Sequence, residues 1–348
     1  MPRTMQETIS IIVPAYNEEL VLRPFLQRLS ATLATLPGYD WEILFVNDGS
    51  TDTTQQIIEA LCAADPRVGG IELSRNFGKE PAMTAGLDHA RGDAIVILDA
   101  DLQDPPELIA DFVREWKNGH DVVVARRTHR DGETWIKKLT AHGFYRVIGA
   151  MSKVDIPANT GDCRLMSRRA VDSLLRMREH HRFMKGLFAW VGYPTKVVDY
   201  RREPRAAGTT KFNYWKLWNF AIEGITSFSI FPLKLATYFG VLIALAAFVA
   251  GAWIVLKTLV WGEDVPGYPS LMVTMLFLGG VQLFFIGILG EYLGRIYNET
   301  KQRPLYLVQS YSAARTAETA SQHAAPADRV AQGPMGAVTP RTPTVPVP

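Results

Sequence analysis

The chain has 348 residues, enough for one large domain or two modest ones. Apolar residues make up 47% of it, charged residues 21%, and the net charge is only +2, so the composition gives no basis for nucleic-acid binding. Two cysteines, Cys62 and Cys163, are too few for a zinc site or a disulfide framework, and we expect free thiols. The first residues lack the apolar core of a signal peptide, which predicts a domain that is not exported.

Strand and helix patterns alternate along the first part of the chain. Apolar runs rich in β-branched residues occupy residues 9–13, 41–46, 68–73, 94–98 and 122–125. Segments with apolar residues at helical spacing separate these runs. This alternation predicts an α/β domain with a mainly parallel, doubly wound sheet. The expected helices are residues 20–36, 53–64, 80–91 and 105–118, and weaker strand and helix candidates follow at 162–166, 168–177 (capped by Ser167), 183–191 and 195–200.

Polar clusters follow the first four predicted strands. In open α/β sheets, ligands bind outside the carboxyl ends of the strands, and these ends share one edge of the sheet. The sequence therefore predicts a binding site at that edge. The clusters are residues 14–19, 47–52, 74–79 and 99–104.

The fourth cluster is acidic: Asp99, Asp101 and Asp104 accompany the amide of Gln103. Hard divalent cations prefer oxygen ligands, so one interpretation is a Mg²⁺ or Mn²⁺ site that holds phosphates of a ligand. The other interpretation is a polar turn in which Asp104 caps the helix begun by the two prolines that follow. For Asp104 we favour the cap, whereas for Asp99 and Asp101 this stretch alone leaves both interpretations open.

The last third of the chain contains two long apolar segments. Residues 236–256 carry no charge, and residues 271–290 have Gln282 as their only strongly polar side chain. Each is about as long as the ~20 residues that span a bilayer. Residues 213–231 mix aromatic and charged side chains, as helices in a membrane interface do. The basic residues that flank the spans put both termini in the cytoplasm, and a buried hairpin in a soluble core is the alternative.

These patterns divide the chain into four parts. We expect a cytoplasmic α/β domain at residues 1–210, interfacial helices at 211–232, a transmembrane hairpin at 233–295 and a cytoplasmic tail at 296–348. From about residue 310 the chain is rich in Ala, Thr, Pro and Gln, which predicts disorder.

A metal–phosphate site beside two membrane spans suits an enzyme that acts on a lipid with an anionic head. Guanidinium and ammonium groups bind phosphate through charge-assisted hydrogen bonds, although solvated surface charge is the alternative for each candidate. A metal would neutralise charge on a departing diphosphate. A lipid phosphate, ionised at neutral pH, can attack without a strong base. The candidate cations for its head are Arg126, Lys138, Arg205 and Lys211.

Several motifs resemble those of a known family. Residues 13–18, 46–52 and 99–106 resemble the nucleotide-sugar motifs of inverting family 2 glycosyltransferases with the GT-A fold. Residues 74–80, 161–166 and 205–211, with the two spans, narrow the resemblance to the polyprenyl-phosphate branch, which includes bactoprenol and dolichyl-phosphate glycosyltransferases. The resemblance implies a GT-A (Rossmann-like) domain followed by interfacial helices and two transmembrane helices in the cytoplasmic (inner) membrane. It also implies a homo-oligomer, for which a tetramer is one arrangement.

The resemblance also assigns roles to individual residues. Asp162 follows the family position discussed as catalytic, and it would either accept a proton or orient an Arg or Lys. Cys163 stands where we would expect an aromatic residue. The implied nucleotide-sugar site consists of Pro14, Tyr16, Asn17, Glu18, Asp48, Lys79, Asp99 and Asp101. The implied Mg²⁺ or Mn²⁺ ligands are Asp101 and Gln103. The implied catalytic and acceptor-phosphate groups are Asp162, Arg126, Lys138, Arg205 and Lys211.

The expected reaction transfers a hexose from a nucleotide sugar to undecaprenyl phosphate with inversion. UDP-glucose is the first choice of donor, while GDP-mannose and a UDP-aminoarabinose-type donor stay open because no motif fixes the base or the sugar. A processive polysaccharide synthase would have more spans and a Gln-x-x-Arg-Trp segment, and the sequence has neither. A non-catalytic membrane scaffold is the remaining alternative.

Overall fold

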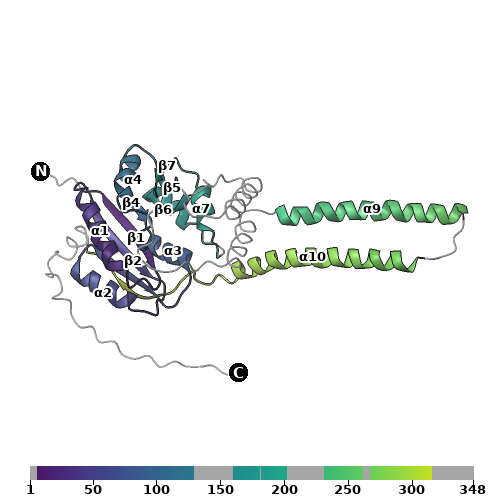
Figure 1. Cartoon of the computed structure of the whole chain (residues 1–348), viewed down its shortest axis with the longest axis horizontal. Coiled ribbons are helices and arrows are strands. Elements are labelled where there is room, and N and C mark those ends of the chain that lie inside the picture. Colours follow the sequence, from purple (N-terminus) through teal and green to yellow (C-terminus); the bar gives the residue numbers. More distant parts are fainter. Residues whose placement is uncertain (1–5, 129–159, 181, 202–230, 262–266, 316–348) are drawn as a thin grey trace, which may run out of the picture.

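The computed structural model describes residues 6–128, 160–180, 182–201, 231–261 and 267–315 (Figure 1). Strands and helices alternate as the sequence predicts. In chain order they are β1 (Thr8–Ala15), α1 (Leu22–Ala34), β2 (Asp40–Asn47), α2 (Thr54–Ala64), β3 (Val68–Leu73), α3 (Lys79–His89), β4 (Ala94–Ile97), α4 (Leu108–Lys117), β5 (Val122–Arg127), β6 (Thr160–Ser167), α6 (Arg168–Leu175), α7 (Met184–Trp190), β7 (Thr195–Tyr200), α9 (Phe231–Trp261), α10 (Tyr268–Thr300) and β8 (Val308–Ser312).

The strands form one eight-stranded sheet in the order β7-β5-β6-β4-β1-β2-β3-β8. Six of them run parallel, and β6 and β8 run antiparallel to their neighbours, so the mainly parallel α/β class is confirmed. In the register of β6, Arg164 lies opposite Ile97 of β4, and Thr160 lies opposite Arg126 of β5. Because β6 is reversed, its first residues lie at the edge where β4 and β5 end.

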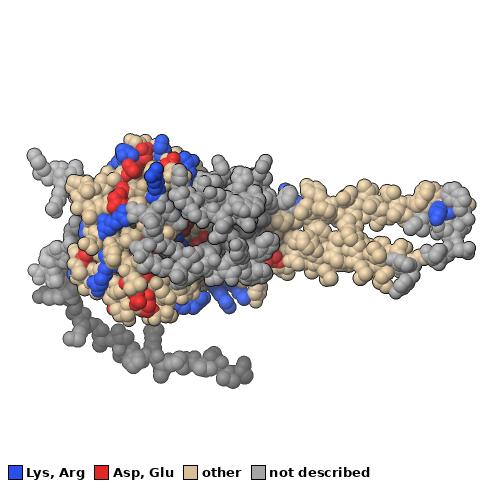
Figure 2. All heavy atoms as spheres, viewed as in Figure 1, with Lys and Arg blue, Asp and Glu red and all other residues tan. Residues whose placement is uncertain are grey.

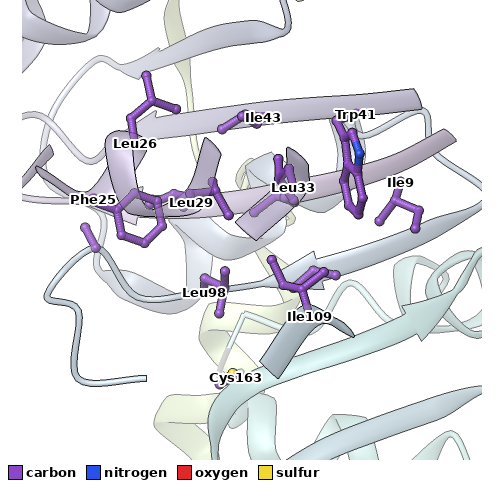
Figure 3. Close-up of a cluster of buried hydrophobic side chains, with 14 of the residues drawn as sticks. Ile9, Phe25, Leu26, Leu29, Leu33, Trp41, Ile43, Leu98, Ile109 and Cys163 are labelled. Atoms are coloured by element: carbon purple, nitrogen blue, oxygen red, sulfur yellow. The ribbon is translucent and has the colours of Figure 1, made fainter. Parts of the chain in front are cut away.

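Helices cover both faces of the sheet. Successive side chains of a strand point to opposite faces, so Ile11 joins one core cluster and Ile12 the other. The first cluster packs under α1, α2 and α4, with Phe25 and Ile109 among its members (Figure 3). The second packs under α3, α6 and α7. The two clusters bury the central strands of the sheet and leave the strand ends as the place for polar chemistry.

Helices α9 and α10 form a long hairpin that projects from the sheet domain (Figure 1). The rings of Phe239 and Phe285 lie 6.4 Å apart between the two helices. On the face shown in Figure 2, charged side chains gather on the sheet domain and are nearly absent between the ends of the hairpin. The apolar windows 232–253 and 270–300 are long enough to cross a membrane, and neither is buried in the described part of the chain. This exposure contradicts the alternative of a hairpin buried in a soluble core.

The segment after α10 returns to the sheet, so the prediction of disorder from about residue 310 is wrong for residues 310–315. Strand β8 pairs with β3, with Tyr311 opposite Ile71. The N–H of Arg315 donates to the carbonyl of Pro66 at 2.7 Å, and the Arg91 guanidinium donates to the carbonyl of Ala314 at 2.7 Å. All five side chains of β8 are exposed. The segment is thus held by pairing with a strand over 200 residues earlier, which local composition does not reveal.

Gly69 of β3 marks the close approach of this returning segment. A Cβ at this position would lie 2.9 Å from the backbone atoms Ala314 N and Ser312 O. We expect Gly69→Ala to destabilise the sheet domain by about 1–3 kcal/mol, because overpacking forces the backbone of the segment to shift. Chemical denaturation followed by tryptophan fluorescence measures the change.

Gly38→Ala is the matched control, since a Cβ there has nothing within 4 Å. It should change stability by less than about 0.5 kcal/mol. Equal stability of the two variants would contradict the packing of β8 against β3.

Candidate functional site

The loops after β1 and β2 are hydrogen bonded to each other. The N–H of Asn17 donates to Ser50 Oγ at 3.0 Å, and the N–H of Thr51 donates to Asn17 Oδ1 at 2.9 Å. The N–H of Glu18 donates to Thr54 Oγ1 at 2.9 Å. Asn17 also has a positive φ of 55°, a conformation that asparagine tolerates better than most residues. The structure thus gives Asn17 a role in shaping the loop that carries the predicted residues Tyr16 and Glu18.

Asp48, the residue directly after β2, holds the loop between β3 and α3. Its two carboxylate oxygens accept hydrogen bonds from the N–H groups of Phe77 at 2.7 Å and Gly78 at 2.9 Å. Burial raises the pKa of Asp48, and these two bonds oppose the rise. Gly49 adopts a φ of +63°, and a Cβ there would lie 2.3 Å from the backbone of Arg75. Both features fix the loop so that α3 begins at the carboxyl edge of the sheet.

Lys79, the first residue of α3, lies between two carboxylates from different strands. Its Nζ is 2.7 Å from Asp99 Oδ1 and 2.6 Å from Asp162 Oδ2, while 43% of its side chain stays exposed. Burial disfavours its charge, but the two carboxylates outweigh burial and raise the pKa of Lys79. Three residues predicted for the site from distant positions are therefore in direct contact.

Neighbouring cations keep the carboxyl group of Asp162 ionised. Burial alone would raise its pKa, but Lys79 and Lys185 lower it below the ordinary value. A carboxylate with a lowered pKa is a weak base. The geometry therefore favours the interpretation in which Asp162 orients Lys79 over the one in which it accepts a proton.

The acidic stretch after β4 turns sharply. The N–H of Gln103 donates to Asp101 Oδ1 at 3.1 Å, and Leu102 has a positive φ of 58°. Within the described residues, no three His, Cys, Asp or Glu side chains group into a ready-made metal centre. Mg²⁺ is usually held by one or two carboxylates together with substrate phosphates and water. The donor set of Asp101 and Gln103 fits a metal that binds together with a diphosphate.

Asp104 does not cap helix α4, and that prediction is wrong. The helix begins at Leu108, preceded by Glu107 as its N-terminal flanking residue. Asp104 is only 1% exposed, and its carboxylate accepts a hydrogen bond from the hydroxyl of Tyr200 on β7. The capping rule is local, whereas this bond joins residues 96 positions apart.

Arg127 joins the carboxylates, whereas its neighbour Arg126 has another partner. Arg127 Nε donates to the Tyr200 hydroxyl at 3.1 Å, and its Nη2 is 4.0 Å from Asp104 Oδ1. Arg126 binds Asp199 at 2.7 and 3.0 Å, where both side chains are about half exposed. Adjacent residues of a strand point to opposite faces, which separates the two arginines. Sequence reasoning singled out Arg126 and missed Arg127, although this alternation was available as a signal.

Arg164 is a second group that sequence reasoning missed. Its guanidinium donates to the carbonyls of Gly161 at 2.9 Å and Asp162 at 3.2 Å, and it stacks on the Phe188 ring at 3.6 Å. Burial lowers the pKa of Arg164 to about 10, against the opposing effect of Asp162. The arginine fixes the turn that presents Asp162 to Lys79.

The remaining predicted groups are placed as follows. Pro14 lies in β1 opposite Val46, and Tyr16 is partly exposed just beyond the strand. Cys163 lies in the core cluster under α4, and both cysteines are free thiols as expected. Lys138, Arg205, Lys211 and nearly all of the expected interfacial segment, 211–230, lie outside the described residues.

Comparison with known proteins identifies the family. A sequence model of glycosyl transferase family 2 matches residues 10–175, and a model of the GtrB C-terminal hairpin matches residues 231–296. The chain is 50% identical over 301 residues to a prophage bactoprenol glucosyl transferase homolog of Escherichia coli K12, covering 86% of this chain and 98% of that protein. It is also 50% identical over 302 residues to the bactoprenol glucosyl transferase of Shigella phage SfX, covering 87% and 99%.

The solved structure of mannosyl-3-phosphoglycerate synthase from Rubrobacter xylanophilus is a more distant match. Its TM-score is 0.43 at 20% identity, covering 62% of this chain and 71% of that chain. A match this weak adds nothing about substrates.

The two family models and the 50% identical relatives, together with the α/β sheet and the apolar hairpin, identify the chain as a glycosyltransferase. The chain belongs to glycosyl transferase family 2, in the polyprenyl-phosphate branch to which the C-terminal hairpin points. The family and the fold expected from the sequence are confirmed.

The contact between Lys79 and Asp162 predicts a pH-dependent contribution to stability. Because the pKa of Asp162 is lowered in the folded protein, the contact stabilises fully above the ordinary pKa of 3.8 and is lost as the pH falls below it. We expect Asp162→Asn to lower the apparent melting temperature at pH 7. The gap to the wild type should narrow between about pH 4 and pH 2.

Asp172→Asn is the matched control, because Asp172 is an exposed acid that pairs only at 3.7 Å with Arg168 on the same helix. It should shift the melting temperature far less at every pH. A gap for Asp162→Asn that stays constant down to pH 2 would contradict the assignment of a charged pair.

Proposed function

We propose that the protein transfers a hexose from a nucleotide sugar to undecaprenyl phosphate at the cytoplasmic face of the membrane, with inversion. UDP-glucose is the donor we favour, because the proteins to which this chain is 50% identical are named as bactoprenol glucosyl transferases. The observation that carries the proposal is the contact of Lys79 with Asp99 and Asp162 at the sheet edge. It gathers the charged residues that such a transfer requires.

In this proposal the donor binds across the ends of β1, β2 and β4. The two hydrogen-bonded loops after β1 and β2 would hold the nucleotide, with Tyr16 and Glu18 on one side and Asp48 on the other. Asp101 and Gln103 would hold Mg²⁺ or Mn²⁺, which supplies positive charge for the diphosphate. Lys79 adds a second positive charge near Asp99.

The chemical step is a displacement at the anomeric carbon. A phosphate oxygen of the acceptor forms the new bond from the face opposite the donor diphosphate, and the electron pair of the broken bond leaves with the nucleoside diphosphate. The acceptor phosphate is ionised at neutral pH, so no side chain has to remove a proton. The lowered pKa of Asp162 agrees with a site that orients charges and does not need a strong base.

The hairpin of α9 and α10 gives the enzyme access to a lipid acceptor. We propose that both helices span the cytoplasmic membrane, with the sheet domain and both termini in the cytoplasm, because basic residues flank the spans. Residues 211–232 would lie in the interface. Residues 126, 138, 205 and 211 stay the predicted acceptor-phosphate groups, and a homo-oligomer stays the predicted assembly.

A donor screen tests the function. Purified full-length protein is incubated with undecaprenyl phosphate, Mn²⁺ and labelled UDP-glucose, GDP-mannose or a UDP-aminoarabinose-type donor, and lipid-linked products are separated by chromatography. We expect a lipid-linked monosaccharide from UDP-glucose. A growing glycan chain would indicate a processive synthase, and no product from any donor would contradict the proposal.

The metal assignment predicts a second outcome. Asp101→Asn should reduce metal-dependent turnover by on the order of a hundredfold, because loss of a direct ligand should cost at least as much as loss of an outer-sphere partner. Mn²⁺ binding in the presence of UDP, followed by electron paramagnetic resonance, should weaken in parallel. Asp111→Asn, which changes a partly exposed acid on α4 paired with Arg114, serves as control. Activity of Asp101→Asn with the metal chelated would show that the assignment is wrong.

A further inference from the structure

Lys185 is a partly buried cation at the second position of α7. It makes no hydrogen bond or ion pair with any of the residues that the structure describes. The first turn of α7 is fastened to the first turn of α3, because the N–H of Met184 donates to Glu80 Oε1 at 3.1 Å. Lys185 therefore directly follows Met184, which is hydrogen bonded to Glu80, the residue after Lys79.

Several cations act on Lys185. Among the described residues, the charged groups with the largest effect on it are one carboxylate, Asp162, and three cations, Arg164, Arg127 and Lys79. Burial lowers the pKa of Lys185, the three cations add to this effect, and Asp162 opposes it. An ammonium group in such a place is costly unless something negative joins it.

The three neighbouring cations are already engaged within the protein. Lys79 binds Asp99 and Asp162, Arg127 binds Tyr200 and lies near Asp104, and Arg164 donates to two backbone carbonyls. Lys185 keeps three N–H donors without a described acceptor. Among the residues that the structure describes, it is the one of these four cations without a hydrogen-bond or ion-pair partner.

We infer that Lys185 binds the phosphate group of the lipid acceptor, an inference that rests on the proposed function. The carboxylate that acts electrostatically on Lys185 is Asp162 on β6, whereas Asp101 and Gln103, which would hold the metal and the donor diphosphate, follow β4. A metal on the β4 side neutralises the donor. The acceptor phosphate, which carries between one and two negative charges at neutral pH, needs a cation on the other side.

The inference explains why Lys185 has no ion-pair partner among the described residues of the site. Residues that serve a ligand often reduce the stability of the free protein. Replacing Lys185 by an apolar side chain of similar length should therefore leave the free protein as stable as the wild type or more stable. A purely structural role for Lys185 would have the opposite effect.

The test compares full-length Lys185→Met with Lys196→Met, which replaces an exposed lysine on β7. We expect Lys185→Met to raise the KM for undecaprenyl phosphate about ten- to a hundredfold, because loss of a charge-assisted hydrogen bond has an effect of this size. The KM for the donor should stay within about twofold of the wild-type value. Lys185→Arg should recover part of the loss. Lys196→Met should match the wild type.

Thermal shift without turnover gives the second measurement. Undecaprenyl phosphate alone should stabilise the wild type more than Lys185→Met, and UDP with Mn²⁺ should stabilise both equally. An unchanged acceptor KM, equal loss of donor and acceptor binding, or a lower melting temperature of free Lys185→Met would each overturn the inference. If the wild type makes no product from any donor, the proposed function fails. Selective stabilisation of the wild type by undecaprenyl phosphate would then still support the role of Lys185.

Discussion

The contacts of Lys79 with Asp99 and Asp162 are the interaction on which the site depends. Asp99 follows β4, Asp162 begins the reversed strand β6, and Lys79 begins α3, so one ammonium group joins three separate elements. Without it, the two carboxylates would lose the cation that they share. Asp48 and Arg164 support this contact from either side, because they fix the backbone next to Lys79 and next to Asp162.

The same helix connects the site to the apolar hairpin. Lys79 begins α3, and Asp88, near its other end, accepts a 2.6 Å hydrogen bond from the Tyr306 hydroxyl and pairs with Arg178. Tyr306 lies between α10 and β8, in the segment that leaves the hairpin. The hairpin is therefore attached to the sheet domain through backbone pairing of β8 and through the helix that carries the site lysine. This attachment limits how far the site can move relative to the apolar helices.

The sequence predicts those parts of the structure that depend on local patterns. Periods of two and of 3.6 residues located the strands, the helices and the sheet edge where polar clusters meet. It does not predict pairings between distant residues, such as Tyr200 with Asp104 or β8 with β3. The placement of Arg127 is only partly predictable from the sequence. Strand alternation separates it from Arg126, but only the buried position of Asp104 shows which face holds the carboxylates.

Charge balance separates the groups that hold the site together from those that can meet a substrate. Lys79 and Arg127 each face carboxylates of the protein, and Arg164 donates to carbonyls. The positive charge of these three side chains is therefore largely compensated within the protein before any ligand binds. Two anionic substrates must still approach one another, and their repulsion is strongest where water is excluded. A divalent cation on the β4 side and Lys185, which pairs with none of the residues that the structure describes, would each neutralise one of the two anions. The transfer would then need no side chain to act as a strong base, because the acceptor arrives as an anion and only its position has to be controlled.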